Sequence, residues 1–411
     1  MKARFKRNAL FAAVLCTALP GAACTAVPGN ARTEAAEASG DGILRIGLLL
    51  DNTGGNAFLN APQLAAAELA VREINAGGGH KGRPVELLPA TPGGDPAAQA
   101  NTFVTLKADV VIGPTDSSNA PAVIDVLSRA RTPLVSPANT AAGLSSAKSG
   151  GYYFRTAPAD IAQAPVLVKL AKEAGANRVS VMHQEGSYGG DVSAAVVRAA
   201  EEAGLDVGAT ASFSPGDAGT AAAKAGEGSG AVILIARDGA QGALAELNNA
   251  GVDGARIILS DGAFARYGGA LAAKALDGAR AVVPGKLAAA GFQGRILEVD
   301  KGLRDMSFAA ETYDAVTLSA LAAAHAQDDA GRSIAANLIA VSGGSEAACT
   351  AYKECLAGLS GGGEINYDGE SGPVAFDANG DITSASFMVF TYGADNNPAP
   401  TGSETAGRAG G

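Results

Sequence analysis

Short apolar runs alternate with stretches of helical spacing along the chain from Ile43 to Ser260. Several runs, such as Val110 to Ile112, are apolar throughout, which is typical of strands buried on both faces of a parallel sheet. The expected strands lie at 43–50, 85–88, 110–112, 133–136, 178–183, 207–213, 231–236 and 256–260. The expected helices lie near 62–76, 96–107, 120–129, 161–174, 191–203, 240–250 and 308–326. This alternation predicts an α/β fold with doubly wound parallel sheets and right-handed crossovers.

The alternation stops after Thr156 and begins again near Ile161, so we expect two lobes of this kind. A chain of 411 residues is long enough for two or three domains of ordinary size. The apolar segment 271–285 is suited to crossing between the lobes. The expected division gives residues 43–156 and about 283–345 to the first lobe, and residues 157–282 and about 346–394 to the second.

Two features are expected near the C-terminal end. The turn sequence from Asp377 to Gly380 lies between two alternating apolar runs, which indicates a hairpin. From Gly393 onward the chain is rich in Pro, Gly, Asn and Ser and lacks core-forming residues. We therefore expect residues 395–411 to form a disordered tail.

Residues 1–24 have the pattern of an export signal, with basic residues near the start, an apolar stretch to Leu19, and small residues before Cys24. Small residues directly before a cysteine resemble a bacterial lipobox, in which that cysteine is lipidated and becomes the mature N-terminus. A plain secretory signal has a similar pattern and remains an alternative. We expect an exported lipoprotein, held at Cys24 at the outer face of the cell membrane or in the periplasm, with 25–42 as a flexible tether.

Charge narrows the possible partners. Removing residues 1–24 takes away four basic residues and leaves 27 basic against 41 acidic residues, a net charge of −14. This balance argues against a nucleic-acid partner. A hydrophobic content of 47% with 18% charged residues is typical of a globular chain.

Cys349 and Cys355 are the cysteines that remain once Cys16 and Cys24 are assigned to the export segment. An even pair in an oxidising compartment favours a disulfide, and two reduced buried thiols are the alternative. A zinc site would need two more ligands, and no histidine lies near the pair in the sequence.

Enzyme signatures are missing from the sequence. The segment 51–56 after the first strand lacks the glycine pattern of a dinucleotide-binding loop, and Lys286 does not belong to a P-loop. The chain has no zinc-binding HExxH motif and no nucleophile elbow of the form GxSxG. His183 ends an expected strand, where it either points into a cleft or is solvated. We therefore expect a protein that is not an enzyme and needs no cofactor or metal.

A binding role has support from polar residues at the expected strand ends. In open α/β sheets, ligands bind outside the carboxyl ends of the strands. Ser117, Ser118 and Thr140 follow two such ends, where helix N-termini offer unpaired N–H groups to a small anion such as a carboxylate. The alternative is that Ser117 and Thr140 are ordinary helix N-caps. The polar residues at strand ends are Asn52, Ser117, Thr140, His183 and Asp261, with Tyr188 just beyond.

Several motifs in a fixed order carry a resemblance to a known family. They are REINAGGGHKGRPVEL at 72–87, Asp95-Pro96, DVVIGPTDSS with TPLVSPANT between 109 and 140, SYGGD at 187–191, ETYDAV at 311–316 and SGPVAFDANGDI at 371–382. Between Ile43 and Tyr392 the chain resembles the extracytoplasmic solute-binding proteins of ABC transporters for branched-chain amino acids and related solutes. The resemblance implies a type 1 periplasmic-binding clamshell, in which two lobes joined by a multi-segment hinge close on a ligand.

The resemblance also implies roles for single residues. In this family the ligand carboxylate is held at the positions of Ser117, Ala138 and Thr140, and Asn139 belongs to the same stretch. Asp261 matches an acid of the second lobe that meets the ligand ammonium. Tyr188 and Tyr313 match aromatic positions at the ligand or the hinge, with ordinary core packing as the alternative.

Specificity is then expected around Phe58, Tyr188, Arg237 and Asp261. Phe58 lies where many relatives carry an aromatic residue. Arg237 and Asp238 either pair with each other at the surface or line the cleft, and in the second case the ligand is more polar than leucine.

These observations predict a monomeric binding lipoprotein that captures an amino acid or a related zwitterion and delivers it to an ABC permease. The alternative is a surface sensor or receptor that uses the same clamshell for a ligand that is not an amino acid.

Overall fold

The first lobe is built on a sheet of five parallel strands in the order β2-β1-β3-β4-β5. The structure, a computed structural model, describes residues 39–286, 288–345 and 348–407. The strands are β1 (Arg45–Leu48), β2 (Glu86–Leu87), β3 (Val110–Ile112), β4 (Leu134–Ser136) and β5 (Tyr153–Arg155). Their side chains are mostly buried on both faces, as the apolar runs predict.

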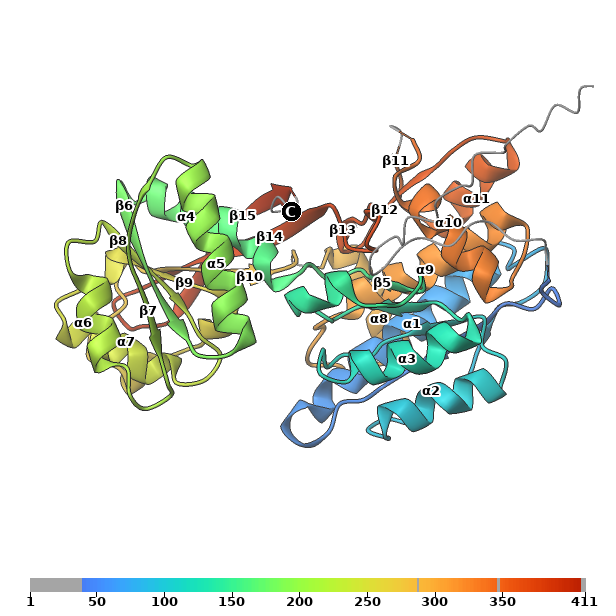
Figure 1. The fold of residues 1–411 in the computed structure, drawn as a ribbon. Helices are drawn as coiled ribbons and strands as arrows, with labels where there is room; N and C mark the ends of the chain where they lie inside the picture. Colours follow the sequence, from blue (N-terminus) through green and yellow to red (C-terminus); the bar gives the residue numbers. More distant parts are fainter. Residues whose placement is uncertain (1–38, 287, 346–347, 408–411) are drawn as a thin grey trace, which may run out of the picture.

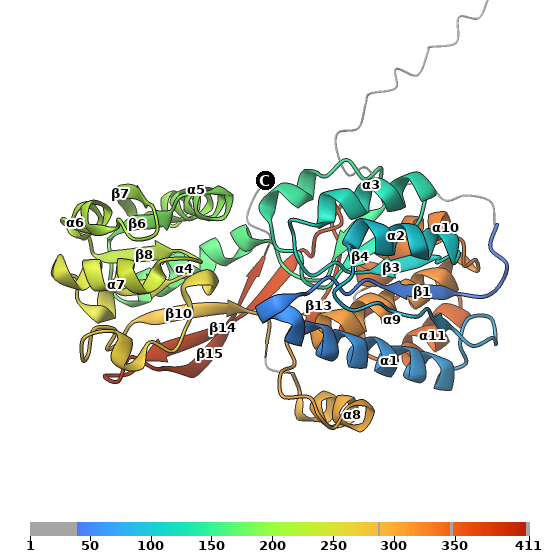
Figure 2. The same cartoon turned by 90° about the horizontal axis from the view of Figure 1, so that it is seen from below.

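Helices cover both faces of this sheet (Figure 2). α2 (Pro96–Thr105) and α3 (Ala120–Ala130) pack on one face, while α1 (Asn60–Ala76) and α9 (Ala309–Ala326) pack on the other. Fifteen of the eighteen α9 residues are buried, which explains why this helix is alanine-rich and apolar on all sides. α8 (Ala290–Val299) and α10 (Gly331–Gly343) flank α1 and α9.

The second lobe has a seven-stranded sheet in the order β15-β14-β10-β9-β8-β6-β7, and it lies beside the first lobe (Figure 1). Its parallel strands are β6 (Arg178–Gln184), β7 (Asp206–Phe213), β8 (Ala231–Ile235), β9 (Ile257–Leu259) and β10 (Arg280–Pro284). One face is covered by α4 (Ala164–Glu173) and α5 (Ser187–Glu202), and the other by α6 (Gly219–Gly226) and α7 (Ala240–Asn249). The prediction of two doubly wound lobes is confirmed.

Residues 348–376 lie in the first lobe, whereas we had assigned them to the second. They form β11 (Ala348–Cys349), α11 (Tyr352–Ser360), β12 (Asn366–Gly369) and β13 (Gly372–Pro373). Tyr352 and Tyr367 are buried in the same core as α1 and α9. The chain therefore returns to the second lobe only at β14 (Ser384–Tyr392).

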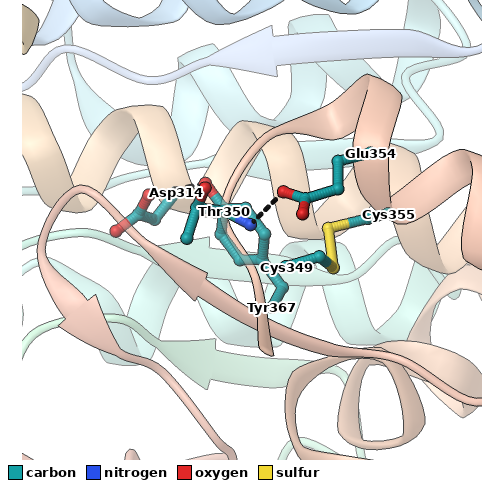
Figure 3. Close-up of a disulfide and its surroundings, with 6 residues drawn as sticks. All are labelled: Asp314, Cys349, Thr350, Glu354, Cys355 and Tyr367. Carbon is teal, nitrogen blue, oxygen red and sulfur yellow. Dashed lines mark hydrogen bonds between the residues drawn. A yellow bond between two sulfur atoms is a disulfide. The ribbon is translucent and has the colours of Figure 1, made fainter. Parts of the chain in front are cut away.

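The expected disulfide is present in this region (Figure 3). Cys349 in β11 and Cys355 in α11 are joined, with 5.4 Å between their Cα atoms. The Thr350 N–H donates to the Glu354 carboxylate at 3.0 Å within the closed loop. The disulfide thus fixes α11 to the small sheet that β11, β12 and β13 form, next to buried Tyr367 and Asp314.

The C-terminal segment is ordered as a strand, which corrects the prediction of a disordered tail from residue 395. β15 (Pro398–Gly407) pairs antiparallel with β14 over nearly its whole length. The long hairpin therefore turns at Gly393–Asn397, while the predicted turn at Asp377–Gly380 closes only a short bridge between Phe376 and Ile382. β15 has few apolar residues, and backbone hydrogen bonds to the edge of the sheet hold it in place.

The predictions for the N-terminal region lie mostly outside the described residues: the signal at 1–24, the lipid anchor at Cys24 and the tether up to residue 38. The last part of the expected tether is fixed to the first lobe. The Gly40 and Gly42 N–H groups donate to Asp328 and Asp329 respectively, each at 2.9 Å. In the part of the chain that the structure describes, no helix is long and apolar enough to cross a membrane.

Candidate functional site

A cavity of about 550 Å³ lies between the two lobes. The first lobe contributes a mostly apolar wall, and the second lobe, with the crossing segment after β5, contributes a polar wall. The lining residues are Ser117, Pro121, Ile124, Asp125, Ala141, Ala142, Gly143, Leu144, Ala147 and Lys148 on the first side, and Asp160, Ser187, Tyr188, Asp191 and Arg237 on the second. The cavity therefore lies outside the strand ends, as expected for an open α/β sheet.

The loop after β3 is held in place by Asp51. Gly113 ends β3 with φ of 119°, and a Cβ atom there would lie 2.5 Å from the Leu49 carbonyl oxygen, so only glycine fits without a shift. The buried Asp51 carboxylate then accepts hydrogen bonds from the Thr115 N–H at 2.8 Å and the Asp116 N–H at 3.1 Å. This role of Asp51 was not predicted, although the position of an acid directly after a buried strand is a signal for it in the sequence.

Ser117 and Thr140 meet as predicted, and they do so without capping a helix. The Ser117 hydroxyl accepts hydrogen bonds from the Thr140 N–H at 3.1 Å and the Ala141 N–H at 3.3 Å. The residue before α3 is Asn119, which makes no side-chain cap. Ser117 thus occupies the two N–H groups that are suited to an anion. Ser117 and Ala141 line the cavity, and Thr140 lies next to Ala141 in the chain without lining it.

Ala138 and Asn139 are buried and do not line the cavity, although the resemblance implies ligand contacts there. The Asn139 side chain is fully buried and donates to the carbonyl oxygens of Pro114 at 3.2 Å and Thr115 at 3.1 Å. The Ala138 N–H donates to the Ser136 hydroxyl at 3.2 Å. Asn139 thus joins the loops that carry Ser117 and Thr140, while Ala138 is held within its own loop.

The opposite wall is a stack of Tyr188 and Arg237. The Arg237 guanidinium lies 4.1 Å from the centre of the Tyr188 ring, a cation–π distance. The same guanidinium binds the Asp160 carboxylate at 3.0 and 3.2 Å. Arg237 therefore lines the cleft and pairs with Asp160 rather than with Asp238, while Gln184 accepts from the N–H groups of both Arg237 and Asp238 at 2.8 Å.

Asp261 is half-buried, accepts hydrogen bonds from two side chains and does not line the cavity, although the resemblance implies an ammonium contact there. Its Oδ1 atom accepts hydrogen bonds from the Tyr188 hydroxyl at 2.5 Å and from the Gln163 amide at 2.6 Å. Its backbone N–H donates to the Gln163 side-chain oxygen at 3.1 Å. Asp261 thus positions the Tyr188 ring from behind.

Asp160 is the acid of the crossing segment that faces the cavity, and the sequence analysis did not find it. It lies four residues after Thr156, and its N–H donates to the Thr140 carbonyl at 2.7 Å, so it joins the two walls. Burial and the nearby Asp261 charge raise the pKa of Asp160 to about 6, although Arg237 acts in the opposite direction.

Other expected site residues lie elsewhere. Tyr313 is a core residue of the first lobe, with its hydroxyl 2.5 Å from Glu73 and its ring edge-on to Phe292. Phe58 lies in a 3₁₀ turn (Gly54–Leu59) outside the cavity and is 53% exposed. His183 is the penultimate residue of β6, where its ring nitrogen contacts the Gln184 carbonyl at 3.2 Å, and it does not line the cavity.

The arrangement suits a small solute with an anionic end and an apolar body. N–H groups and a hydroxyl lie on one side, a guanidinium and an aromatic ring lie on the other, and alanine, leucine and isoleucine side chains lie between. Across residues 39–286, 288–345 and 348–407, no group of three or more His, Cys, Asp or Glu is placed to hold a metal ion.

Comparisons with known proteins show the family to which the chain belongs. A family model described as periplasmic binding protein matches residues 43–403. The Leu/Ile/Val-binding protein homolog 3 of Brucella melitensis is 32% identical over 178 residues, which cover 42% of this chain and 48% of that protein. The chain thus spans about half the length of the curated relatives that it matches.

Solved structures share the fold at low identity. The branched-chain amino acid transporter substrate binding protein LivJ of Streptococcus pneumoniae, in complex with isoleucine, has a TM-score of 0.59 and 21% identity, over 89% of this chain and all of that chain. A solute binding protein of R. palustris, in complex with benzoate, has a TM-score of 0.58 and 20% identity, over 90% of this chain and 98% of that chain. These likenesses confirm the two-lobed α/β fold.

Proposed function

The chain belongs to the periplasmic binding protein family, and we propose that it captures a small carboxylate-bearing solute between its lobes for an ABC importer. The family implies an extracytoplasmic location and agrees with the expectation that the chain is not an enzyme. The observation that carries the proposal is the cavity itself, which both lobes line and which joins an N–H edge to a guanidinium. Export and anchoring at Cys24 are part of the same proposal.

In the proposed complex the solute carboxylate takes the Thr140 and Ala141 N–H groups, with the Ser117 hydroxyl turning from acceptor to donor. Charged acceptors strengthen such hydrogen bonds roughly twofold over neutral ones. The apolar part of the solute would lie against Ala141 and Leu144, with the Tyr188 ring on the far side. Closure of the lobes would then exclude water from the solute carboxylate and the two N–H groups, which strengthens the interaction between them further.

An amino acid is the first candidate solute. Its ammonium needs an acid. Asp125, Asp160 and Asp191 line the cavity whereas Asp261 does not, and Asp160 is the buried one of the three, so we take it as the partner of the ammonium. An amino acid would therefore have to replace the Arg237 guanidinium at Asp160. The relatives named for leucine, isoleucine and valine support this candidate.

A carboxylate without an ammonium, such as an aromatic acid, is the second candidate. It is favoured by one observation: Arg237 already neutralises Asp160 and stacks on Tyr188, so no cation is needed from the solute. The benzoate complex of the R. palustris protein supports this candidate.

A thermal-shift screen of the mature protein separates the two candidates. A solute that binds only the folded state at 100 times its Kd stabilises the protein by about 2.7 kcal/mol, which raises the melting midpoint by several degrees. The screen would use L-leucine, L-isoleucine, L-valine, benzoate and 4-hydroxybenzoate. Absence of a shift for every one of these carboxylates would contradict the proposal.

Substitutions then test the walls of the cavity. Ser117→Ala should weaken any hit at least tenfold in Kd, since a hydrogen bond to a charged group contributes about 1.5–3 kcal/mol.

Asp160→Asn should abolish the shift with an amino acid and preserve it with an aromatic acid. Asp238→Asn is the matched control, because Asp238 follows Arg237 and does not line the cavity.

A further inference from the structure

Arg155 is the largest fully buried side chain among the described residues. It is the last residue of β5, directly before the chain crosses to the second lobe. A buried guanidinium is costly unless charges and hydrogen bonds compensate it. The hydrogen-bond partners of Arg155 therefore indicate its role, and they belong to two separate parts of the structure.

The first group of partners belongs to the hinge. The Arg155 Nε donates to the Asp381 carboxylate at 2.7 Å, and the Arg155 backbone N–H donates to the Gly380 carbonyl at 2.9 Å. Asp381 belongs to the segment between β13 and β14, which carries the chain from the first lobe into the second. The Nε side of the guanidinium is thus fixed to a crossing segment.

The second group of partners belongs to the loop that forms one wall of the cavity. The terminal nitrogens of Arg155 donate to the carbonyl oxygens of Ala141 at 2.9 Å and Asn139 at 3.2 Å, and to the Ser145 hydroxyl at 2.8 Å. Ala141 lines the cavity, and its N–H is one of the two that Ser117 holds. The planar guanidinium, whose donors have a fixed geometry, therefore joins the hinge to the cavity loop 139–145.

We propose that Arg155 is a positioning residue that couples lobe closure to the shape of the solute site. Movement of residues 380–381 during closure is transmitted through the guanidinium to the carbonyl groups of Asn139 and Ala141. The N–H groups of Thr140 and Ala141, on the same peptide loop, move with them. The inference rests on the proposed function only in taking these N–H groups as solute contacts.

Hydrogen exchange tests the coupling without any ligand. Asp381→Asn keeps an oxygen acceptor for Nε and removes the charge, so the protein should still fold. We expect the amides of peptide 139–147 to exchange at least five times faster in this variant, although Asp381 touches none of them. The measurement is exchange followed by mass spectrometry on the unliganded protein.

Asp314→Asn is the matched control. Asp314 is also a buried acid of the first lobe, and it accepts hydrogen bonds from Tyr367, Glu370 and Ser371, away from the cavity loop. If Asp381→Asn and Asp314→Asn lower the melting midpoint alike and both leave peptide 139–147 unchanged, Arg155 has only a structural role and the proposal is wrong.

A double-mutant cycle distinguishes coupling between the hinge and the cavity loop from a local loosening of that loop. Ser145→Ala removes the partner on the cavity side, and Asp381→Asn weakens the partner on the hinge side. Because both act through one guanidinium, their effects on exchange in 139–147 should be non-additive. Additive effects would overturn the proposal, whereas failure to find a solute would contradict the proposed function and leave this result standing.

Discussion

Asp160 is the residue on which the charge balance of the cavity depends. The side chain of Asp160 is 4% exposed, it is paired with Arg237, and its pKa is raised to about 6 mainly by burial. A carboxyl with a raised pKa takes up a proton in mildly acidic solution, which is unusual for an aspartate. Acidification therefore changes the charge that the cavity presents to a solute.

This titration predicts opposite pH profiles for the two candidate solutes. Below pH 6 Asp160 becomes neutral, so the affinity for an amino acid should fall by about tenfold per pH unit. Protonation also frees Arg237, so the affinity for benzoate should rise or stay constant over the same range. Calorimetric titrations at pH 5.0 and 7.5 measure both, and Asp160→Asn should make the benzoate profile flat.

Single residues also show why the site was only partly predictable. Ser117 and Thr140 were found because hydroxyls at strand ends follow from the β-α order. Asp160 and Asp261 each lie shortly after the end of a strand. The sequence does not show which of the two faces the cavity and which is held behind another side chain. The Tyr188 hydroxyl and the Gln163 amide, which decide that question, lie 73 and 98 residues away from Asp261.

At the scale of elements, buried strands and amphipathic helices were predictable because their periodicity is local. β3, α3 and β4 lie within one or two residues of their expected bounds. The segment 348–376 was assigned to the wrong lobe, since chain order does not state which core accepts Tyr352 and Tyr367. β15 was missed because its stabilisation comes from backbone pairing, which leaves no apolar pattern.

The disulfide should stabilise the first lobe. It closes a loop of sequence separation 6, and a loop of that size contributes about 2 kcal/mol by restricting the unfolded chain. We expect the double variant Cys349→Ser, Cys355→Ser to lose about that much unfolding free energy in urea. Solute affinity should not change, because the pair lies outside the cavity. As a control, dithiothreitol should lower the stability of the wild-type protein and leave that of the double variant unchanged.

β15 should be required for the stability of the second lobe. It covers the outer edge of β14, where Phe387 and Val389 are buried, and its Glu404 binds Lys169 of α4 at 2.5 Å. Ending the chain at Asn397 should lower the melting midpoint of this lobe by several degrees and expose an edge strand that promotes aggregation. Lys169→Ala, which removes only the ion pair, should shift the midpoint far less.

For the whole molecule, the region between the lobes contains a carboxyl that resists ionisation. Glu311, in the first turn of α9, lies beside residues of three crossing segments: Thr156, Gly285 and Ile382. Burial raises the pKa of Glu311 to about 7, and the nearby Asp314 charge adds to the effect. In the unfolded chain the same group ionises at the ordinary glutamate value, so folding favours its protonated form.

The sign of the pH effect follows. The stability that comes from protonated Glu311 is fully present below about pH 4 and is lost as the pH rises to about 7. Glu311→Gln should therefore raise the unfolding free energy by on the order of 1 kcal/mol at pH 8 and leave it nearly unchanged at pH 4. Urea melts at the two pH values measure this, and an equal gain at both would contradict the assignment to a titrating group.

The placement of α9 has a consequence for dividing the protein into parts. Residues 39–156 supply every strand of the first sheet, yet one face of that sheet is covered by α9, from residues 309–326. A fragment cut at the first crossing would expose that apolar face and aggregate. To express this lobe alone, an engineer would have to join residue 156 to the segment that begins near α8, with a short linker in place of the second lobe.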